Sequence, residues 1–164
     1  MQSKSIYGFT LIELLVVIMT MTLLFSLGFA NYREFQRRQY LESASRGVEA
    51  DLRYAQVLAL SGKKTSGCNI LHGYMFRRTS ATQYRLESVC NNNQDCNMNV
   101  NFCVKTVNLP AGVTLNALVC GGCGNRFYFK SLARGISNSS NVVLTLVFSG
   151  STKTTTVTPS GEIR

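Results

Sequence analysis

The sequence predicts an α+β fold in which one long N-terminal helix packs on an antiparallel β domain. Residues 9–32 form an almost uninterrupted apolar run, and residues 33–61 continue it with an amphipathic helical pattern. Residues 62–164 alternate short β-prone runs with polar turns. We therefore divide the chain of 164 residues at these boundaries, with residues 1–8 as a short polar segment before the helix.

The apolar run from Phe9 to Tyr32 contains one charged residue, Glu13. About 20 apolar residues span a bilayer as a helix, so the run predicts a transmembrane segment. It is too long for a signal peptide, and no A-x-A-like cleavage site follows it. A charge at the centre of a membrane helix costs at least about 2.5–3.5 kcal/mol, so Glu13 is a candidate functional residue. The alternative is a glutamate that snorkels to the membrane interface.

The second part of the helix has a narrow apolar face. Apolar or small residues recur at spacings of three and four: Leu41, Ala44, Val48, Leu52, Ala55 and Ala59. Polar residues occupy the opposite face: Glu42, Arg46, Glu49, Arg53 and Gln56. The pair Ser61-Gly62 predicts the end of a helix that covers about residues 10 to 60.

The β domain is predicted to contain seven strands, because Val, Thr, Tyr and Phe dominate short runs between polar turns. These runs are Gly73–Arg78, Gln83–Val89, Val100–Val107, Val113–Val119, Arg126–Ser131, Val142–Phe148 and Lys153–Thr158. Ser149-Gly150-Ser151 predicts the turn of a C-terminal hairpin, and Asn91–Asn101 a polar loop.

The segment Gly8-Phe9-Thr10-Leu11-Ile12-Glu13 resembles the class III signal of type IV prepilins and pseudopilins. The resemblance implies that residues 1–8 are a leader peptide, which a prepilin peptidase removes by cutting between Gly8 and Phe9. It also implies that Phe9 is N-methylated and that Glu13 meets the N-terminal amine of a neighbouring subunit in a filament. The physics agrees, because a carboxylate in a low dielectric needs a paired cation.

Four later segments are similar to the GspH/FimT group of minor pilins and pseudopilins. They are Asp51–Leu60, Gly73-Tyr74, Leu109–Val113 and Val157–Ile163. The resemblance implies the type IV pilin-like fold and a filament subunit of a type II secretion system or a type IV pilus. The implied partners are other pilins or pseudopilins, the prepilin peptidase and an inner-membrane assembly platform.

The charges that flank the apolar run favour a cytoplasmic β domain, whereas the processing motif Gly8–Glu13 implies the opposite orientation in the membrane. Positive residues favour the cytoplasmic flank. Lys4 stands alone before the run, whereas three arginines follow it: Arg33, Arg37 and Arg38. We give precedence to the motif, because six cysteines confined to the β domain suggest an oxidising compartment. The sequence therefore predicts a single-pass inner-membrane protein with a periplasmic soluble domain.

The β domain is strongly basic, since residues 62–164 hold eleven Lys and Arg against three acids, Glu87, Asp95 and Glu162. Such a surface attracts nucleic acid, phospholipid headgroups or an acidic partner, unless it is only a solvated face. Some FimT-type members bind DNA during uptake through a C-terminal G-R-x-R element. Here Gly161-Glu162-Ile163-Arg164 matches it in part, with an acid in place of the first arginine. The candidate DNA or anion contacts are Arg126, Lys130, Arg134, Lys153 and Arg164.

The six cysteines are candidates for structural disulfides: Cys68, Cys90, Cys96, Cys103, Cys120 and Cys123. Their pairing cannot be deduced from sequence. The Cys120-Gly-Gly-Cys123 motif has two further interpretations. It is either redox-active, with a lowered thiol pKa, or half of a zinc site completed by Cys96 and Cys103.

An enzyme needs converging catalytic groups, and the β domain offers one histidine, His72, and three acids. Nothing in the sequence positions His72 beside an acid, so we interpret it as a structural histidine. The same shortage of carboxylates disfavours a calcium site. We expect no catalytic activity, no metal and no cofactor.

Overall fold

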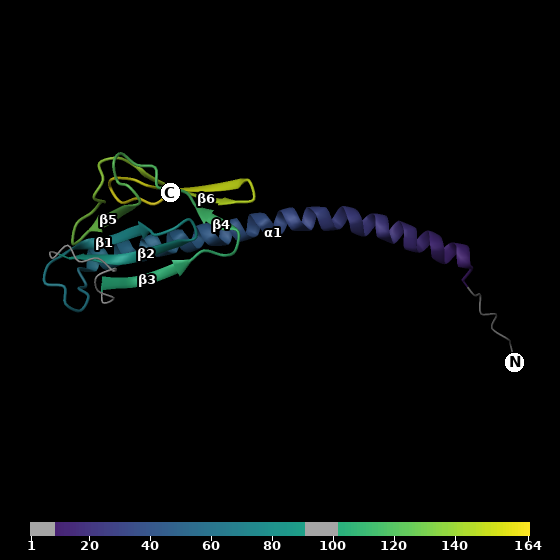
Figure 1. The fold of residues 1–164 in the computed structure, drawn as a ribbon, viewed down its shortest axis with the longest axis horizontal. Coiled ribbons are helices and arrows are strands. Elements are labelled where there is room, and N and C mark those ends of the chain that lie inside the picture. Colours follow the sequence, from purple (N-terminus) through teal and green to yellow (C-terminus); the bar gives the residue numbers. More distant parts are fainter. Residues whose placement is uncertain (1–8, 91–101) are drawn as a thin grey trace. The chain divides into compact units, whose positions relative to one another are not determined.

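The computed structural model describes residues 9–90 and 102–164, with only the backbone for residues 27–31 (Figure 1). The fold is α+β with antiparallel sheets, which confirms the predicted class. The chain divides into two compact units, Met1–Arg37 and Arg38–Arg164. Helix α1 (Leu11–Ser61) contributes a segment to each unit.

In the described part of the chain, seven strands follow α1. They are β1 (Leu71–Arg78), β2 (Gln83–Cys90), β3 (Cys103–Asn108), β4 (Val113–Leu115), β5 (Arg126–Lys130), β6 (Val142–Phe148) and β7 (Ser151–Val157). Four of them form sheet A in the order β3-β2-β1-β5, and three form sheet B in the order β4-β6-β7. Both sheets lie beside the second part of α1 (Figure 1).

The apolar face of α1 in the second unit is buried, as its spacing predicted. Its six residues, called the seam here, are at most 7% exposed: Leu41, Ala44, Val48, Leu52, Ala55 and Ala59. They share one core cluster with the inner faces of both sheets. Sheet A contributes the aromatic side chains of Phe76, Tyr84 and Phe127, whose rings stack at centroid distances of 4.9 and 5.8 Å. Sheet B contributes aliphatic residues such as Leu144.

Three polar contacts fix α1 against the sheets at the margins of the seam. The hydroxyl of Tyr84 donates to Asp51 Oδ2 at 2.7 Å, and Lys105 Nζ donates to Asp51 Oδ1 at 2.6 Å. On the sheet B side, Lys153 Nζ donates to Glu42 Oε2 at 2.9 Å. Burial of the ring, and then the hydrogen bond to Asp51, raises the pKa of Tyr84 well above the usual tyrosine value.

The strand boundaries differ from the sequence prediction in several places, and the larger differences concern β4 and β3. The strand predicted over residues 113–119 is too long, because β4 ends at Leu115. Asn116 and Ala117 are both exposed, which breaks the alternation of a half-buried strand, and pairing resumes only as an isolated bridge at Val119. The strand predicted over residues 100–107 begins at Cys103 in the described residues, and residues 100–101 lie outside them.

The C-terminal hairpin has a tighter turn than predicted. Phe148 pairs with Ser151, so the turn is Ser149-Gly150 alone and β7 begins two residues earlier than expected. Both turn residues have positive φ, 47° at Ser149 and 88° at Gly150. This is the pattern of a type I′ turn, whose twist matches that of the flanking strands.

The first unit presents an apolar helical surface. Every large apolar side chain from Phe9 to Phe25 is exposed, with exposed fractions from 41% to 84%. No helix among the described residues is both long and apolar enough to cross a membrane.

Replacing Leu52 with alanine tests the seam. Leu52 is fully buried, so Leu52→Ala leaves a cavity and should lower the free energy of unfolding by about 2–5 kcal/mol. Leu60→Ala is the matched control on the same helix, because Leu60 is 45% exposed and its loss should cost about 0.5 kcal/mol or less. Urea denaturation of both variants measures the difference. Equal losses would contradict the assignment of the seam as the core.

Alkaline titration tests the buried phenol. Because the pKa of Tyr84 is raised in the folded chain, the unfolded chain loses this proton first as the pH rises. The contribution of Tyr84 to stability is therefore constant below about pH 10 and is lost above it. Absorbance of phenolate should show a component that appears only with alkaline unfolding and is smaller by one phenol in Tyr84→Phe, because burial also raises the pKa of Tyr74. A late component of unchanged amplitude in this variant would contradict the prediction.

Candidate functional sites

Helix α1 begins with a capped first turn that contains Glu13. The backbone N–H of Glu13 donates to Thr10 Oγ1 at 3.4 Å, and that of Leu14 donates to the Thr10 carbonyl at 3.2 Å. Thr10 and Glu13 have the spacing of a capping box. An acid in the first turn also interacts favourably with the helix dipole. This role was not predicted from the sequence, although the Thr-x-x-Glu pattern signals it.

The residues of the predicted processing site are only partly described. Gly8 lies outside the described residues, whereas Phe9 is described and 76% exposed. Glu13 is exposed four positions further on. The exposed carboxylate therefore lies at the start of a helical segment whose large apolar side chains are also exposed.

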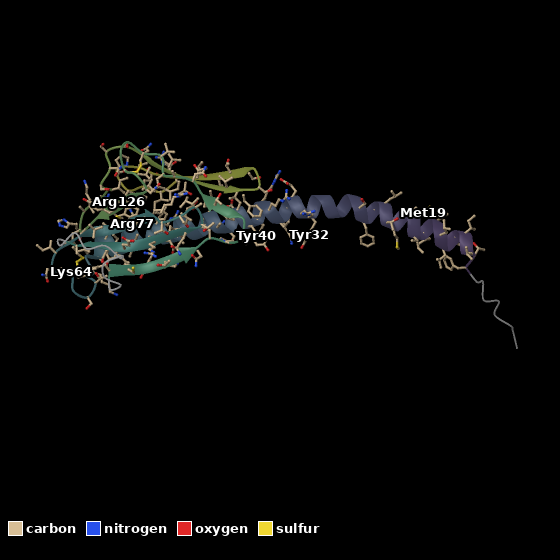
Figure 2. All side chains as sticks on the ribbon, in the orientation of Figure 1. Met19, Tyr32, Tyr40, Lys64, Arg77 and Arg126 are labelled. Carbon is tan, nitrogen blue, oxygen red and sulfur yellow. A yellow bond between two sulfur atoms is a disulfide. The ribbon has the colours of Figure 1, made fainter. Side chains whose placement is uncertain are left out.

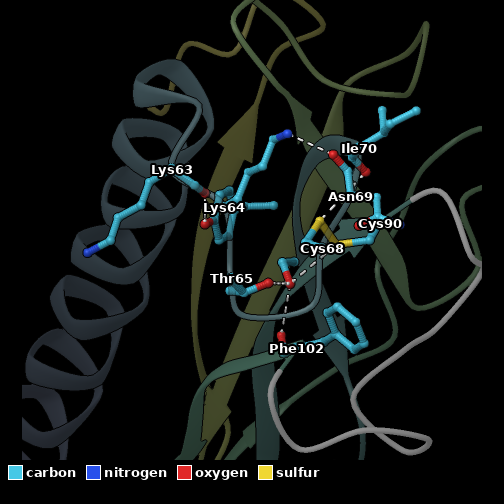
Figure 3. The surroundings of a disulfide bond; sticks show 10 residues. Lys63, Lys64, Thr65, Cys68, Asn69, Ile70, Cys90 and Phe102 are labelled. Carbon is cyan, nitrogen blue, oxygen red and sulfur yellow. Dashed lines mark hydrogen bonds between the residues drawn. A yellow bond between two sulfur atoms is a disulfide. The ribbon is translucent and has the colours of Figure 1, made fainter.

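A disulfide joins Cys68, which precedes β1, to Cys90 at the end of β2 (Figure 3). Their Cα atoms are 5.6 Å apart, within the usual range for a disulfide. Phe102 is 1% exposed and packs against this bond. The hydroxyls of Thr65 and Ser88 lie 2.7 Å apart beside it. The bond therefore lies in a small core of its own, where it ties the segment between α1 and β1 to the end of β2.

A second disulfide joins Cys120 and Cys123, so the CxxC motif is oxidised and lies in the loop between β4 and β5. Cys103 is also disulfide-bonded, and Cys96 lies outside the described residues. The described residues contain no group of three or more His, Cys, Asp or Glu that could hold a metal ion. Three of the four ligands of the zinc interpretation, Cys103, Cys120 and Cys123, are therefore held in disulfides, and the redox interpretation stays a prediction.

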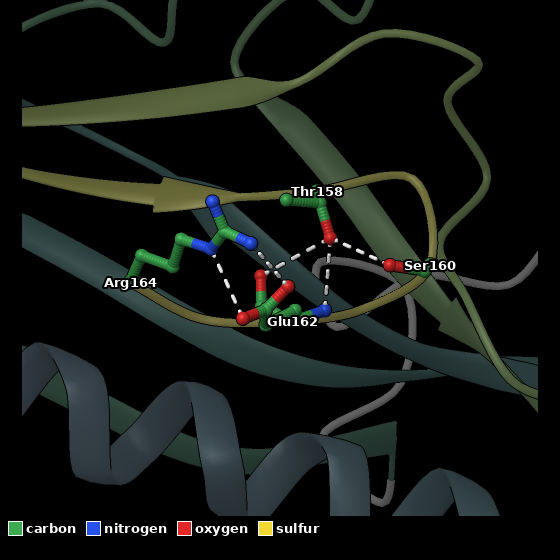
Figure 4. A network of polar contacts seen from close by, with 4 residues as sticks. All are labelled: Thr158, Ser160, Glu162 and Arg164. Carbon is green, nitrogen blue, oxygen red and sulfur yellow. Dashed lines mark hydrogen bonds and ion pairs between the residues drawn. The ribbon is translucent and has the colours of Figure 1, made fainter.

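The C-terminal end forms a closed polar network (Figure 4). The guanidinium of Arg164 donates to both carboxylate oxygens of Glu162, each at 3.0 Å. This contact lowers the pKa of Glu162 and raises that of Arg164. Thr158 accepts a hydrogen bond from the Glu162 backbone N–H at 3.0 Å, and its hydroxyl lies 2.8 Å from that of Ser160. Glu162 therefore forms an ion pair with Arg164, the arginine that was predicted to contact a phosphate.

The five candidate anion contacts do not form one patch. Lys153 is paired with Glu42, and Arg164 with Glu162. Arg126, Lys130 and Arg134 are exposed, and none has an acidic partner among the described residues. Arg126 and Arg134 line different cavities.

His72 is exposed in β1, and its carbonyl accepts a hydrogen bond from the Ser131 N–H at 2.8 Å. Within the described residues its side chain contacts no acid. Glu87, the buried acid of β2, forms an ion pair with Arg77 at 3.3 Å instead.

Comparison with models of known protein families finds no match, and comparisons with curated proteins and with solved structures find none either.

A tryptic digest without reduction tests the two disulfides. Cleavage after lysine and arginine places Cys68 in residues 65–77, Cys90 in residues 86–105, and both Cys120 and Cys123 in residues 106–126. We expect the first two peptides to be linked and the third to be separate, lighter by two hydrogens than its reduced form. Mass spectrometry before and after reduction detects both. Fragmentation of the linked pair distinguishes Cys90 from Cys96 and Cys103, which lie in the same peptide. A link between residues 106–126 and either other peptide would overturn the pairing.

Proposed function

We propose that this chain is a minor pilin or pseudopilin, a non-catalytic subunit of a type II secretion or type IV pilus filament. The observation that supports the proposal best is the capped start of α1. It combines an exposed carboxylate, Glu13, with an exposed apolar surface that continues to Phe25. A helix that is apolar all round is stable where other helices or lipid cover it.

In this proposal a prepilin peptidase removes residues 1–8, which creates a new amine at Phe9. The N-methylated amine of one subunit then pairs with Glu13 of its neighbour, while apolar side chains of the two helices pack together. Before assembly, the apolar segment anchors the subunit in the inner membrane. There the subunit meets the assembly platform. The β domain faces the periplasm, where its disulfides are stable.

DNA binding during uptake is the alternative function. The contacts of the C-terminal segment Gly161-Glu162-Ile163-Arg164 weigh against DNA binding by that segment, because both carboxylate oxygens of Glu162 accept hydrogen bonds from the guanidinium of Arg164. A role in nucleic-acid binding then depends on cations elsewhere in the β domain.

Two substitutions separate the proposed docking role of Glu13 from its capping role. Glu13→Gln keeps a residue suited to the capping box but removes the charge. Thr10→Ala removes the cap at a cost of about 0.5–2 kcal/mol and keeps the charge. We expect Glu13→Gln to be processed normally but absent from sheared filaments, and Thr10→Ala to be assembled. The assay compares both variants with the wild type in cells that carry the assembly system.

Filament levels equal to the wild type in Glu13→Gln would show that the charge is not needed. Mass spectrometry of the mature chain supplies an independent check on processing. The chain should begin at Phe9 with one added methyl group, and a chain that keeps residues 1–8 would contradict the proposed cleavage.

A further inference from the structure

The disulfides Cys68–Cys90 and Cys120–Cys123 differ in how far solvent reaches them. Cys68 and Cys90 are 7% and 5% exposed, and the buried ring of Phe102 packs against their bond. Cys120 and Cys123 are both half-buried. Exchange of a disulfide requires a thiolate to reach one of its sulfur atoms, so exposed disulfides are the labile ones. Access therefore favours exchange at Cys120–Cys123.

The chain on either side of Cys123 leaves room for an approaching molecule. Gly122 and Gly124 are exposed, and their φ values of 83° and 62° favour glycine. A Cβ atom at either position would have no atom within 4 Å outside the adjacent residues. The residues next to Cys123 therefore carry no side chain that would block a nucleophile.

Cys123 lines two cavities of about 470 Å³ each, and Arg77 and Arg126 line both of them as well. Cys120 lines neither. Figure 2 shows the two arginines beside each other in the β domain, where β1 pairs with β5. Arg77 forms an ion pair with the buried Glu87. Arg126 is exposed, and no acid pairs with it among the described residues.

A turn of the chain keeps Arg126 close to Cys123, because the Arg126 N–H donates to the Cys123 carbonyl at 3.4 Å. The nucleophile in thiol–disulfide exchange is a thiolate, which is an anion. A cation at the site of attack raises the local concentration of such an anion. The charge of Arg126 therefore favours attack at Cys123 over attack at Cys120.

Opening the Cys120–Cys123 bond costs the fold little. The bond joins cysteines three positions apart, whereas 22 positions separate Cys68 from Cys90. A disulfide stabilises a fold mainly by constraining the unfolded chain, and the constraint grows with the length of the loop that it closes. Reduction of Cys120–Cys123 is therefore compatible with a folded β domain.

Hydrogen bonds hold the start of the loop independently of the disulfide. The backbones of Val119 and Val143 exchange two hydrogen bonds, at 2.9 and 3.1 Å. The Gly121 N–H donates to Ser140 Oγ at 2.9 Å. At the other end of the loop, β5 begins at Arg126. The two cysteines therefore stay near each other after reduction, and their bond can form again.

We propose that Cys120–Cys123 is an exchange site for a dithiol oxidoreductase, a protein that carries two reactive cysteine thiols. One thiolate of this partner attacks Cys123 Sγ, which forms a mixed disulfide and releases Cys120 as a thiolate. The second thiolate attacks the partner's sulfur in the mixed disulfide and releases Cys123. Two electrons pass from the partner dithiol to Cys120 and Cys123, and the two protons that the partner's thiols lose balance those that the cysteines take up. The exchange does not depend on the assembly role of α1, so either proposal can fail alone.

Trapping with thioredoxin tests the exchange on the full chain in a nonionic detergent. The probe is a thioredoxin in which serine replaces the second cysteine of its reactive pair, so that the probe cannot resolve the mixed disulfide. An alkylating agent then blocks the released Cys120. We expect one adduct, in which fragmentation of residues 106–126 finds thioredoxin at Cys123 and the alkyl group at Cys120. No adduct, or an adduct at Cys120, Cys68 or Cys90, would overturn the proposal.

Graded reduction with dithiothreitol compares the two disulfides in the folded chain. Free thiols are alkylated at intervals, and the tryptic peptides are quantified by mass spectrometry. We expect residues 106–126 to be labelled about tenfold faster than the link between residues 65–77 and 86–105 is lost, because that link is buried. Circular dichroism should stay that of the folded chain. Equal rates, or labelling of residues 106–126 only with loss of this signal, would contradict the proposal.

Replacing Arg126 with glutamine tests the approach to Cys123. At low salt, Arg126→Gln should slow the reduction of Cys120–Cys123 about threefold, the effect of one charge near the surface. The difference should vanish at about 1 M salt. The matched control is Arg53→Gln, which removes the same charge from an exposed position of α1 that lines neither cavity, and should change the rate by less than about 1.5-fold. Equal effects of the two substitutions would overturn attack through the cavities.

Discussion

The fold of the second unit depends on burial of the α1 seam between two sheets. In the described part of the chain, sheet A and sheet B share no strand, and their inner faces meet in one core cluster that contains the seam. The seam includes three alanines, at positions 44, 55 and 59. Because their side chains are small, the aromatic side chains of sheet A and the aliphatic side chains of sheet B can both pack against the same face of α1. The inner face of sheet A is occupied in this way, and on its opposite face Arg77, Arg85 and Arg126 lie across from one another in a row, called the arginine row.

Polar contacts at the margins of the seam explain why net charge is a poor guide to binding in this chain. Lys105 and Lys153 are two of the cations that make the β domain basic, yet both are committed to acids of α1, at Asp51 and Glu42. Arg164 is committed to Glu162 in the same way. Such pairs fix the rotation of the helix against the sheets. Fewer cations are therefore available to bind an external anion than the composition suggests. Arg126 is one of them, because it is exposed and lies opposite Arg77, which Glu87 holds in place.

The parts of the structure that follow from local pattern could be predicted from the sequence. The seam is a periodic signal, and the strand over Val142–Phe148 is an uninterrupted β-prone run, so both have the expected bounds. The arginine row could not be predicted, because it depends on the non-local register that aligns Arg85 and Arg126 on either side of Arg77. The pairing of Cys68 with Cys90 is also non-local, whereas Cys120 and Cys123 are separated by only three positions in the sequence. The capping role of Glu13 was predictable from four residues, because the Thr-x-x-Glu pattern is local.

The cap and the proposed docking contact use different atoms of the same residue. Capping engages the backbone N–H of Glu13, which donates to Thr10 Oγ1. The proposed contact would engage the carboxylate, which is exposed. The capped turn holds that carboxylate near the positive end of the helix dipole, which lowers the cost of its charge in an apolar surrounding. A dipole supplies about half an elementary charge, so it cannot neutralise a full carboxylate once water is removed. A cation from outside the turn is then required, and an amine at the start of a second copy of this helix would supply one with the correct charge.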